Sequence, residues 1–122
     1  MANTNVTEWT HIVRPGADDC HYRGYLVSGA RLLQYVTDCI ACLSVREGTG
    51  GLVANINGNF RVEVHAMDEL VVKLKLEKIG NTSRFYSFTI YKTIEYSNDG
   101  TATAKVLEKA LLTADGTVTL AV

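Results

Sequence analysis

The residues best suited to proton transfer gather in one stretch, Asp18–Leu43. Asp19 and His21 stand in a loop flanked by glycines, and Asp38 stands in the helix predicted to follow. An imidazole titrates near neutral pH and carboxylates accept protons, so these groups can share the two halves of an acid–base reaction. We predict Asp38, His21 and Asp19 as catalytic residues. The alternatives are a salt bridge for Asp38 and a hydrogen-bonded spacer role for His21.

A helix is predicted over Ser28–Ser44, because apolar residues recur there at steps of three and four. This apolar stripe consists of Gly29, Leu32, Leu33, Val36, Ile40 and Leu43. Ser28 is a suitable N-cap. The opposite face carries Arg31, Tyr35, Asp38 and Cys42, with no lysine or glutamate. A helix with two such faces should be covered on both sides, and we expect function on the second face.

The rest of the chain alternates with the period of a strand. Strands are predicted at Glu8–Arg14, Leu52–Ile56, Phe60–Val64, Leu70–Ile79, Arg84–Tyr96, Thr101–Thr113 and Thr117–Val122. Asn57–Asn59 is interpreted as a turn or bulge, and Asn98–Gly100 as a hairpin turn. One helix cannot cover both faces of five strands. We therefore expect a single α+β domain over residues 1–122, a curved antiparallel sheet of five to six strands around one long central helix, which is the hotdog fold.

The overall composition excludes several classes of function. The 122 residues carry a formal net charge of −1, so long-range attraction to nucleic acid or to an anionic membrane is not expected. No apolar run is long enough to span a bilayer, and the first residues do not resemble a secretory signal. Cys39 and Cys42 form a CxxC pattern inside the predicted helix, without a second pair. We therefore expect reduced thiols, no metal and a cytoplasmic protein.

Two motifs carry a resemblance to a known family. Asp19-Cys20-His21-Tyr22, with Gly24 and then Leu26–Arg31, resembles a DAHYxGNLVDGAR pattern, and Gly80–Arg84 matches a second motif, GNTSR. These patterns belong to the hotdog-fold CoA-thioester ammonia lyases, which act on 3-aminobutyryl-CoA and β-alanyl-CoA. The resemblance covers most of residues 9–95. It implies a homodimer with sites at the subunit boundary, and leaves open whether dimers assemble further.

This chain departs from the family pattern at several positions. The family glutamate one turn after Asp38 is Cys42, the family asparagine before the helix is Tyr25, and the family glycine before Asp68 is Met67. Cys42 is either a reactive thiol or a small buried hydrophobic residue. Glu63 and His65 share one face of a predicted strand, so they are an alternative source of the missing carboxylate.

The resemblance implies a lyase that adds or eliminates ammonia at the β-position of an acyl-CoA. Such a reaction needs a base, an acid, and donors directed at the thioester oxygen, which the N-terminus of a helix provides. Glycine there either admits a ligand or only permits close packing. The implied substrate-binding residues are Tyr22, Gly29, Ala30, Arg31, Tyr35, Cys42 and Phe60, and the implied CoA-binding residues are Asn81, Thr82, Ser83 and Arg84. No cofactor is expected beyond the coenzyme A of the substrate.

Two alternatives remain open from the sequence. One is a thioesterase or hydratase-like enzyme in which Asp38 activates water. The other is a non-catalytic protein that binds an acyl group carried by CoA or by a carrier protein.

Overall fold

The computed structural model describes residues 7–20, 22–96 and 103–122. Its elements, in chain order, are β1 (Glu8–Val13), the short 3-10 helices η1 (Ala17–Asp19) and η2 (Arg23–Tyr25), α1 (Gly29–Glu47), β2 (Leu52–Phe60), β3 (Glu69–Ile79), β4 (Ser83–Tyr96) and β5 (Ala104–Ala121). The predicted hairpin turn at Asn98–Gly100 lies outside these residues.

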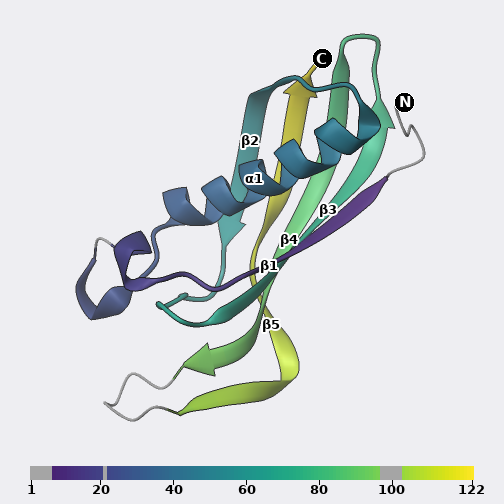
Figure 1. Ribbon diagram of the computed structural model, residues 1–122. Coiled ribbons are helices and arrows are strands. Elements are labelled where there is room, and N and C mark those ends of the chain that lie inside the picture. The colour runs from purple at the N-terminus through teal and green to yellow at the C-terminus, as the bar shows by residue number, and fades with distance from the viewer. Residues whose placement is uncertain (1–6, 21, 97–102) are drawn as a thin grey trace.

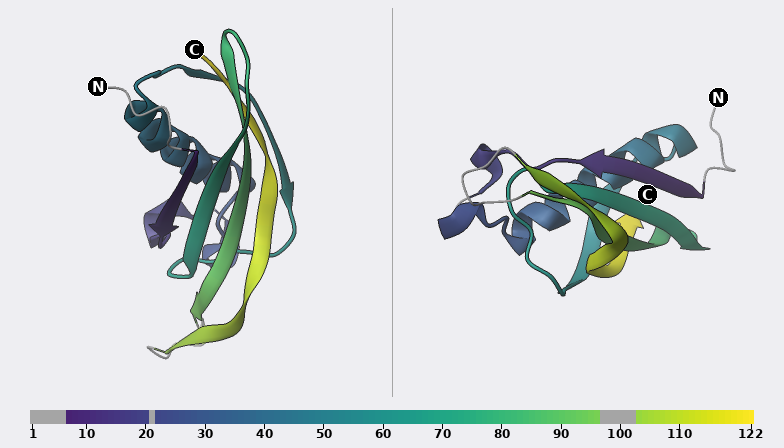
Figure 2. Two further views of the ribbon diagram at one scale, coloured as in Figure 1. Left: turned by 90° about the vertical axis from the view of Figure 1, so that its right-hand side faces the viewer. Right: turned by 90° about the horizontal axis from the view of Figure 1, so that it is seen from below.

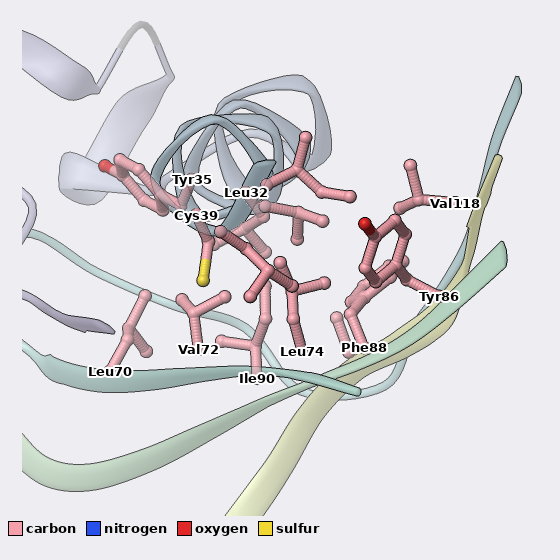
Figure 3. Packing of buried hydrophobic residues seen from close by; sticks show 14 of the residues in the cluster. Leu32, Tyr35, Cys39, Leu70, Val72, Leu74, Tyr86, Phe88, Ile90 and Val118 are labelled. Atoms are coloured by element: carbon pink, nitrogen blue, oxygen red, sulfur yellow. The ribbon is translucent and has the colours of Figure 1, made fainter. Parts of the chain in front are cut away.

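The five strands form one antiparallel sheet in the order β1-β3-β4-β5-β2, and α1 lies across its concave face (Figures 1 and 2). This arrangement confirms the predicted α+β fold, with five strands. Successive side chains of a strand point to opposite faces, so every second residue of β3 faces the helix. Leu70, Val72 and Leu74 are accordingly buried, in one cluster with Leu32 and Cys39 of α1 (Figure 3).

Both ends of α1 are capped by local chemistry. The Ser28 hydroxyl accepts a hydrogen bond from the Arg31 amide at 3.2 Å, as its prediction as N-cap requires. At the other end Gly48 adopts φ +79°, and its N–H donates to the carbonyls of Ser44 and Val45. The helix therefore ends at Glu47, three residues beyond the predicted end. Among the described residues, no helix has both the length and the apolar character needed to cross a bilayer.

The predicted break at Asn57–Asn59 is wrong. These residues continue β2 and pair with Thr117, Gly116 and Asp115 of β5. Gly58 is required for close packing: an added Cβ would lie 3.0 Å from Leu33 of α1. The irregularity of β2 lies instead between Val53 and Asn55.

Two other predicted strand boundaries also differ. The predicted strand Phe60–Val64 does not form, because only Phe60 belongs to β2 and the rest of that run connects β2 to β3. β5 is one continuous strand where two had been predicted. A side chain at Gly116 would collide with the backbone carbonyl of Asn57, so this glycine allows two strands to pair closely rather than ending one of them.

Candidate functional site

A cavity of about 330 Å³ opens at the N-terminal end of α1. Its lining comes from the segment before the helix, from the helix itself and from the connection that follows β2. Gly29 and Phe60, both predicted to bind substrate, meet here: an added Cβ on Gly29 would lie 2.9 Å from the Phe60 ring. Glycine at this position therefore permits close packing of Phe60 beside the cavity.

The same helix end offers backbone donors. The first amides of a helix have no acceptor within the helix, and together they favour negative charge. Ser28 accepts from the amide of Arg31. The amides of Gly29 and Ala30 precede it and belong to the same first turn, so they are free of acceptors within the helix, and Gly29 lines the cavity.

Glu63 also lines this cavity. Its carboxylate oxygen lies 3.9 Å from Nε2 of His65, and the Glu63 side chain is exposed whereas that of His65 is about one-third exposed. A carboxylate and an imidazole therefore stand together at the open end of the helix. Glu63 and His65 are not among the predicted site residues. The sequence indicates them only as an alternative source of the missing carboxylate, because they share one face of a predicted strand.

The connection that carries Glu63 and His65 is held by a buried ion pair. Nζ of Lys92 lies 3.3 Å from a carboxylate oxygen of Asp68, and the two side chains are 3% and 0% exposed. Lys92 also donates to the carbonyl of Glu63 at 2.8 Å. Asp68 accepts from the amides of His65 and Tyr96, both at 2.9 Å. These contacts fix the backbone from which both candidate side chains project.

The two predicted catalytic residues that the structure describes, Asp38 and Asp19, have no contact with each other. Asp38 is exposed on α1 and does not line the cavity at Gly29. Asp19 accepts from the Gly16 amide at 2.8 Å and lies 3.7 Å from Nε of Arg31, so it anchors the preceding loop to the helix. His21 lies outside the described residues.

The second face of α1 is covered only in part. Tyr35 is buried on the side of the helix away from Tyr86, and Cys42 is half-buried (Figure 3). Burial raises the pKa of Tyr35 to about 12, and the negative charge of Asp19 contributes to the increase. Arg31 donates to Gln34 at 2.6 Å. Tyr35 and Arg31 thus lie apart from the cavity.

The GNTSR motif forms the turn between β3 and β4, and its arginine points inward. Arg84 donates to the carbonyls of Gly80 and Ser83, and its Nε lies 3.9 Å from a carboxylate oxygen of Glu47. Glu47 is buried and accepts from the Tyr86 hydroxyl at 3.0 Å. Arg84 therefore joins this turn to the C-terminal end of α1.

The other predicted contact residues stand at the surface. Tyr22, Ala30, Asn81 and Thr82 are exposed. The turn at 80–84 lies at the far end of α1 from Gly29 (Figure 1), and 19 helical residues span about 28 Å. The two predicted parts of the site are therefore well separated within one chain.

Comparison with known proteins adds independent information. Residues 25–96 match the model of the family described as the thioesterase superfamily. The 3-aminobutyryl-CoA ammonia lyase of Acetoanaerobium sticklandii is 37% identical over 84 residues, which are 67% of this chain and 67% of that protein.

Solved structures give a similar result. The β-alanyl-CoA:ammonia lyase of Clostridium propionicum superposes with a TM-score of 0.86 at 25% identity, covering 100% of this chain and 87% of that one. A hypothetical thioesterase of Streptococcus pneumoniae, solved with coenzyme A, has a TM-score of 0.77 at 13% identity, covering 98% of this chain and 83% of that one. The latter likeness concerns the fold alone.

Proposed function

Because this chain belongs to the thioesterase superfamily and, within it, to the hotdog-fold CoA-thioester ammonia lyases as a divergent member, we propose that it adds or eliminates ammonia at the β-position of an acyl-CoA. The observation that carries this proposal is the meeting, at one cavity, of the N-terminal end of α1 with Glu63 and, beside it, His65. Helix amides and an acid–base pair are the two components that the reaction requires.

In the elimination direction, the α C–H and β C–N bonds break and a carbon–carbon double bond forms. Negative charge develops on the thioester oxygen, where the amides of Gly29 and Ala30 stabilise it. The Glu63 carboxylate removes the α-proton. His65, as the imidazolium, protonates the departing amine, which leaves as ammonia. In this assignment the Glu63–His65 pair takes the role of the family glutamate that Cys42 replaces.

We propose further that the working site belongs to a homodimer. Because the turn at 80–84 stands about one helix length from Gly29 within one chain, we assign Asn81, Thr82 and Ser83 to the second copy. β2 is an edge strand with large exposed apolar side chains: Leu52 is 79% exposed and Phe60 is 50% exposed. An open apolar edge of this kind favours pairing with another strand.

The second candidate function is thioester hydrolysis. Asp38 is exposed and forms no ion pair among the described residues, so its carboxylate is available to activate water, and the superfamily match is compatible with this chemistry. The two reactions differ in their products: only hydrolysis releases the thiol of CoA, and only the lyase reaction needs ammonium.

A spectrophotometric assay separates these functions. Purified protein is mixed with crotonyl-CoA or acryloyl-CoA plus ammonium, and loss of enoyl-thioester absorbance and release of thiol are followed together. The lyase predicts loss that depends on ammonium and falls about 100-fold or more in Glu63→Gln, as expected for removal of a general base. Glu108→Gln, an exposed carboxylate on β5, is the matched control and should retain activity.

The remaining outcomes point elsewhere. Thiol release that does not depend on ammonium, and that is lost in Asp38→Asn, favours the thioesterase. If neither signal appears while CoA esters still bind, the proposal of catalysis on these substrates is wrong and the protein is a binding protein for acyl thioesters.

A further inference from the structure

The cavity at Gly29 is the first of three that follow the connection between β2 and β3. It shares Val62 and Glu63 with a second cavity of about 420 Å³, which also contains Lys92. The second shares His65 and Tyr96 with a third cavity of about 280 Å³. The three cavities are therefore neighbours in a row that runs from the N-terminal end of α1, past the Glu63–His65 pair, to the third cavity, and we call this row the groove.

The lining of the third cavity is mainly apolar and aromatic. Besides His65 and Tyr96 it contains Ala17, Tyr25, Ala66 and Met67. At about 30 Å³ for a group the size of a water molecule, it holds roughly nine such groups, enough for a chain of several methylenes. Lys92 does not make the groove a site for an anion, since its charge is already paired with Asp68 and with Glu95.

Two residues of this cavity have an unfavourable backbone conformation. Tyr25 has φ +58° and Met67 has φ +74°, in the left-handed region that residues with a Cβ adopt at a cost. Hydrogen bonds hold both in place: the Tyr25 carbonyl accepts from Ala66, and the Met67 amide donates to Pro15. Asparagine or glycine would fit this backbone better, yet the chain places a large side chain at each position. Strained residues of this kind concentrate at functional sites.

We infer that the groove receives the acyl chain of the substrate, and that the preferred substrate is a CoA thioester whose acyl group continues for several carbons, or as an aromatic ring, beyond the β-carbon. This inference rests on the proposed function, because the Glu63–His65 pair must lie beside the reacting α- and β-carbons. The acyl chain then passes His65 and ends between Tyr25 and Met67.

A series of enoyl thioesters tests this inference. Ammonium addition is measured with crotonyl-CoA, trans-2-hexenoyl-CoA, trans-2-octenoyl-CoA and cinnamoyl-CoA. Each methylene that becomes buried is worth about fourfold in binding. We therefore expect kcat/KM to be at least about tenfold higher for octenoyl-CoA than for crotonyl-CoA.

The variants Tyr25→Asn and Met67→Gly remove the walls of the third cavity and suit the left-handed backbone, so they should fold at least as stably as the parent protein. Each should reduce the preference for octenoyl-CoA over crotonyl-CoA about fivefold or more. The control is Val45→Asn on the exposed surface of α1, which should retain the preference. A preference for crotonyl-CoA in the parent protein, or a ratio unchanged in both groove variants, overturns the inference and leaves the proposed reaction standing.

A binding measurement separates failure of the reaction from failure of the groove. If no thioester reacts with ammonium, the affinities of butyryl-CoA and octanoyl-CoA are compared by calorimetry. Tighter binding of octanoyl-CoA that is lost in Met67→Gly supports the groove although the lyase proposal has failed. Equal affinities overturn the groove as well.

Discussion

The two ends of α1 are built differently. At the C-terminal end, the Glu47 carboxylate is buried beside Arg84 and accepts from the Tyr86 hydroxyl. Gly48 then turns the chain away and donates to the last carbonyls. At the N-terminal end, Ser28 accepts from one amide, and the helix opens onto a cavity.

This difference separates a structural end from a candidate reactive one. A carboxylate near a helix C-terminus is electrostatically unfavourable, so Glu47 is acceptable only because Arg84 and Tyr86 compensate it. At the N-terminal end the favourable electrostatics of the amides remain available to a ligand. The connection that bears Glu63 at this end is held in place by the buried ion pair of Lys92 and Asp68, since Lys92 also donates to the Glu63 carbonyl.

The largest effect is expected from Asp68→Ala. Removing one partner of a buried ion pair leaves the charge of Lys92 uncompensated, and the amides of His65 and Tyr96 lose their acceptor. Unfolding in urea, followed by circular dichroism, should show that the free energy of unfolding falls by about 3–5 kcal/mol. The control, Glu95→Gln, removes the half-exposed partner of Lys92 and should cost less than about 1 kcal/mol. Equal small losses in both variants would contradict this view of the open end.

A smaller effect on stability is expected from Glu47→Ala at the C-terminal end of α1. The Tyr86 hydroxyl is then buried without its acceptor, and Arg84 loses the neighbouring charge. The expected destabilisation is about 1–3 kcal/mol. Tyr86→Phe is the matched variant: it removes the donor but leaves Glu47 with Arg84, and should cost about 1 kcal/mol. If Glu47→Ala leaves the free energy of unfolding unchanged, the contacts of Glu47 with Arg84 and Tyr86 do not stabilise the C-terminal end of α1.

High pH tests two buried tyrosines, Tyr35 in the N-terminal half of α1 and Tyr86 beside Glu47 at its C-terminal end. Burial raises the pKa of Tyr35 to about 12, and burial together with the Glu47 charge raises the pKa of Tyr86. Since both values exceed the ordinary value of 10.0, the native state favours the protonated phenols. Their contribution to stability is complete below pH 10 and declines as the pH rises, by up to about 1.4 kcal/mol per pH unit for each tyrosine.

The measurement is the urea midpoint at pH 9, 10 and 11, for the parent protein and for Tyr35→Phe and Tyr86→Phe, at roughly constant ionic strength. Each variant should lose less stability than the parent above pH 10. The variant with the smaller decline identifies the phenol that limits alkaline stability. Parallel declines in all three proteins would show that neither phenol is responsible.

The fold could be predicted because periodicity is a local property of the sequence. The stripe of α1 and the alternation of β3 each predict which side chains face the core. Four of the six stripe residues and Leu70, Val72 and Leu74 are buried, but Tyr35, predicted on the second face, is buried too. Asn57–Asn59 misled the prediction because a glycine needed for a turn and a glycine needed for packing look the same in sequence. Only the approach of Leu33 to Gly58 distinguishes them.

The site was harder to predict because its geometry depends on distant contacts. Lys92 fixes the backbone of Glu63 from 29 residues away in sequence, and no local pattern encodes that bond. Arg84 is a residue type that suits phosphate binding, yet the buried carboxylate of Glu47 on α1 holds its side chain against the protein interior. The resemblance indicated the N-terminal end of α1, where a cavity lies, whereas the proposed acid–base residues depend on the path of one connection.

The smallest effect is expected in α1 at Cys42, the position at which the family pattern of the resemblance has a glutamate. Burial raises the pKa of Cys39 to about 12, so its thiol is protonated at pH 8, whereas Cys42 is half-buried and more accessible. We expect a maleimide at pH 8 to label Cys42 before Cys39, as mass spectrometry of peptides can show, and Cys39 to react only when urea unfolds the protein. Cys42→Ser should change stability by less than about 0.5 kcal/mol and leave the ammonium-dependent rate within about twofold. A large loss of rate with unchanged stability would return the chemistry to the middle of the helix and argue against Glu63 as the replacement carboxylate.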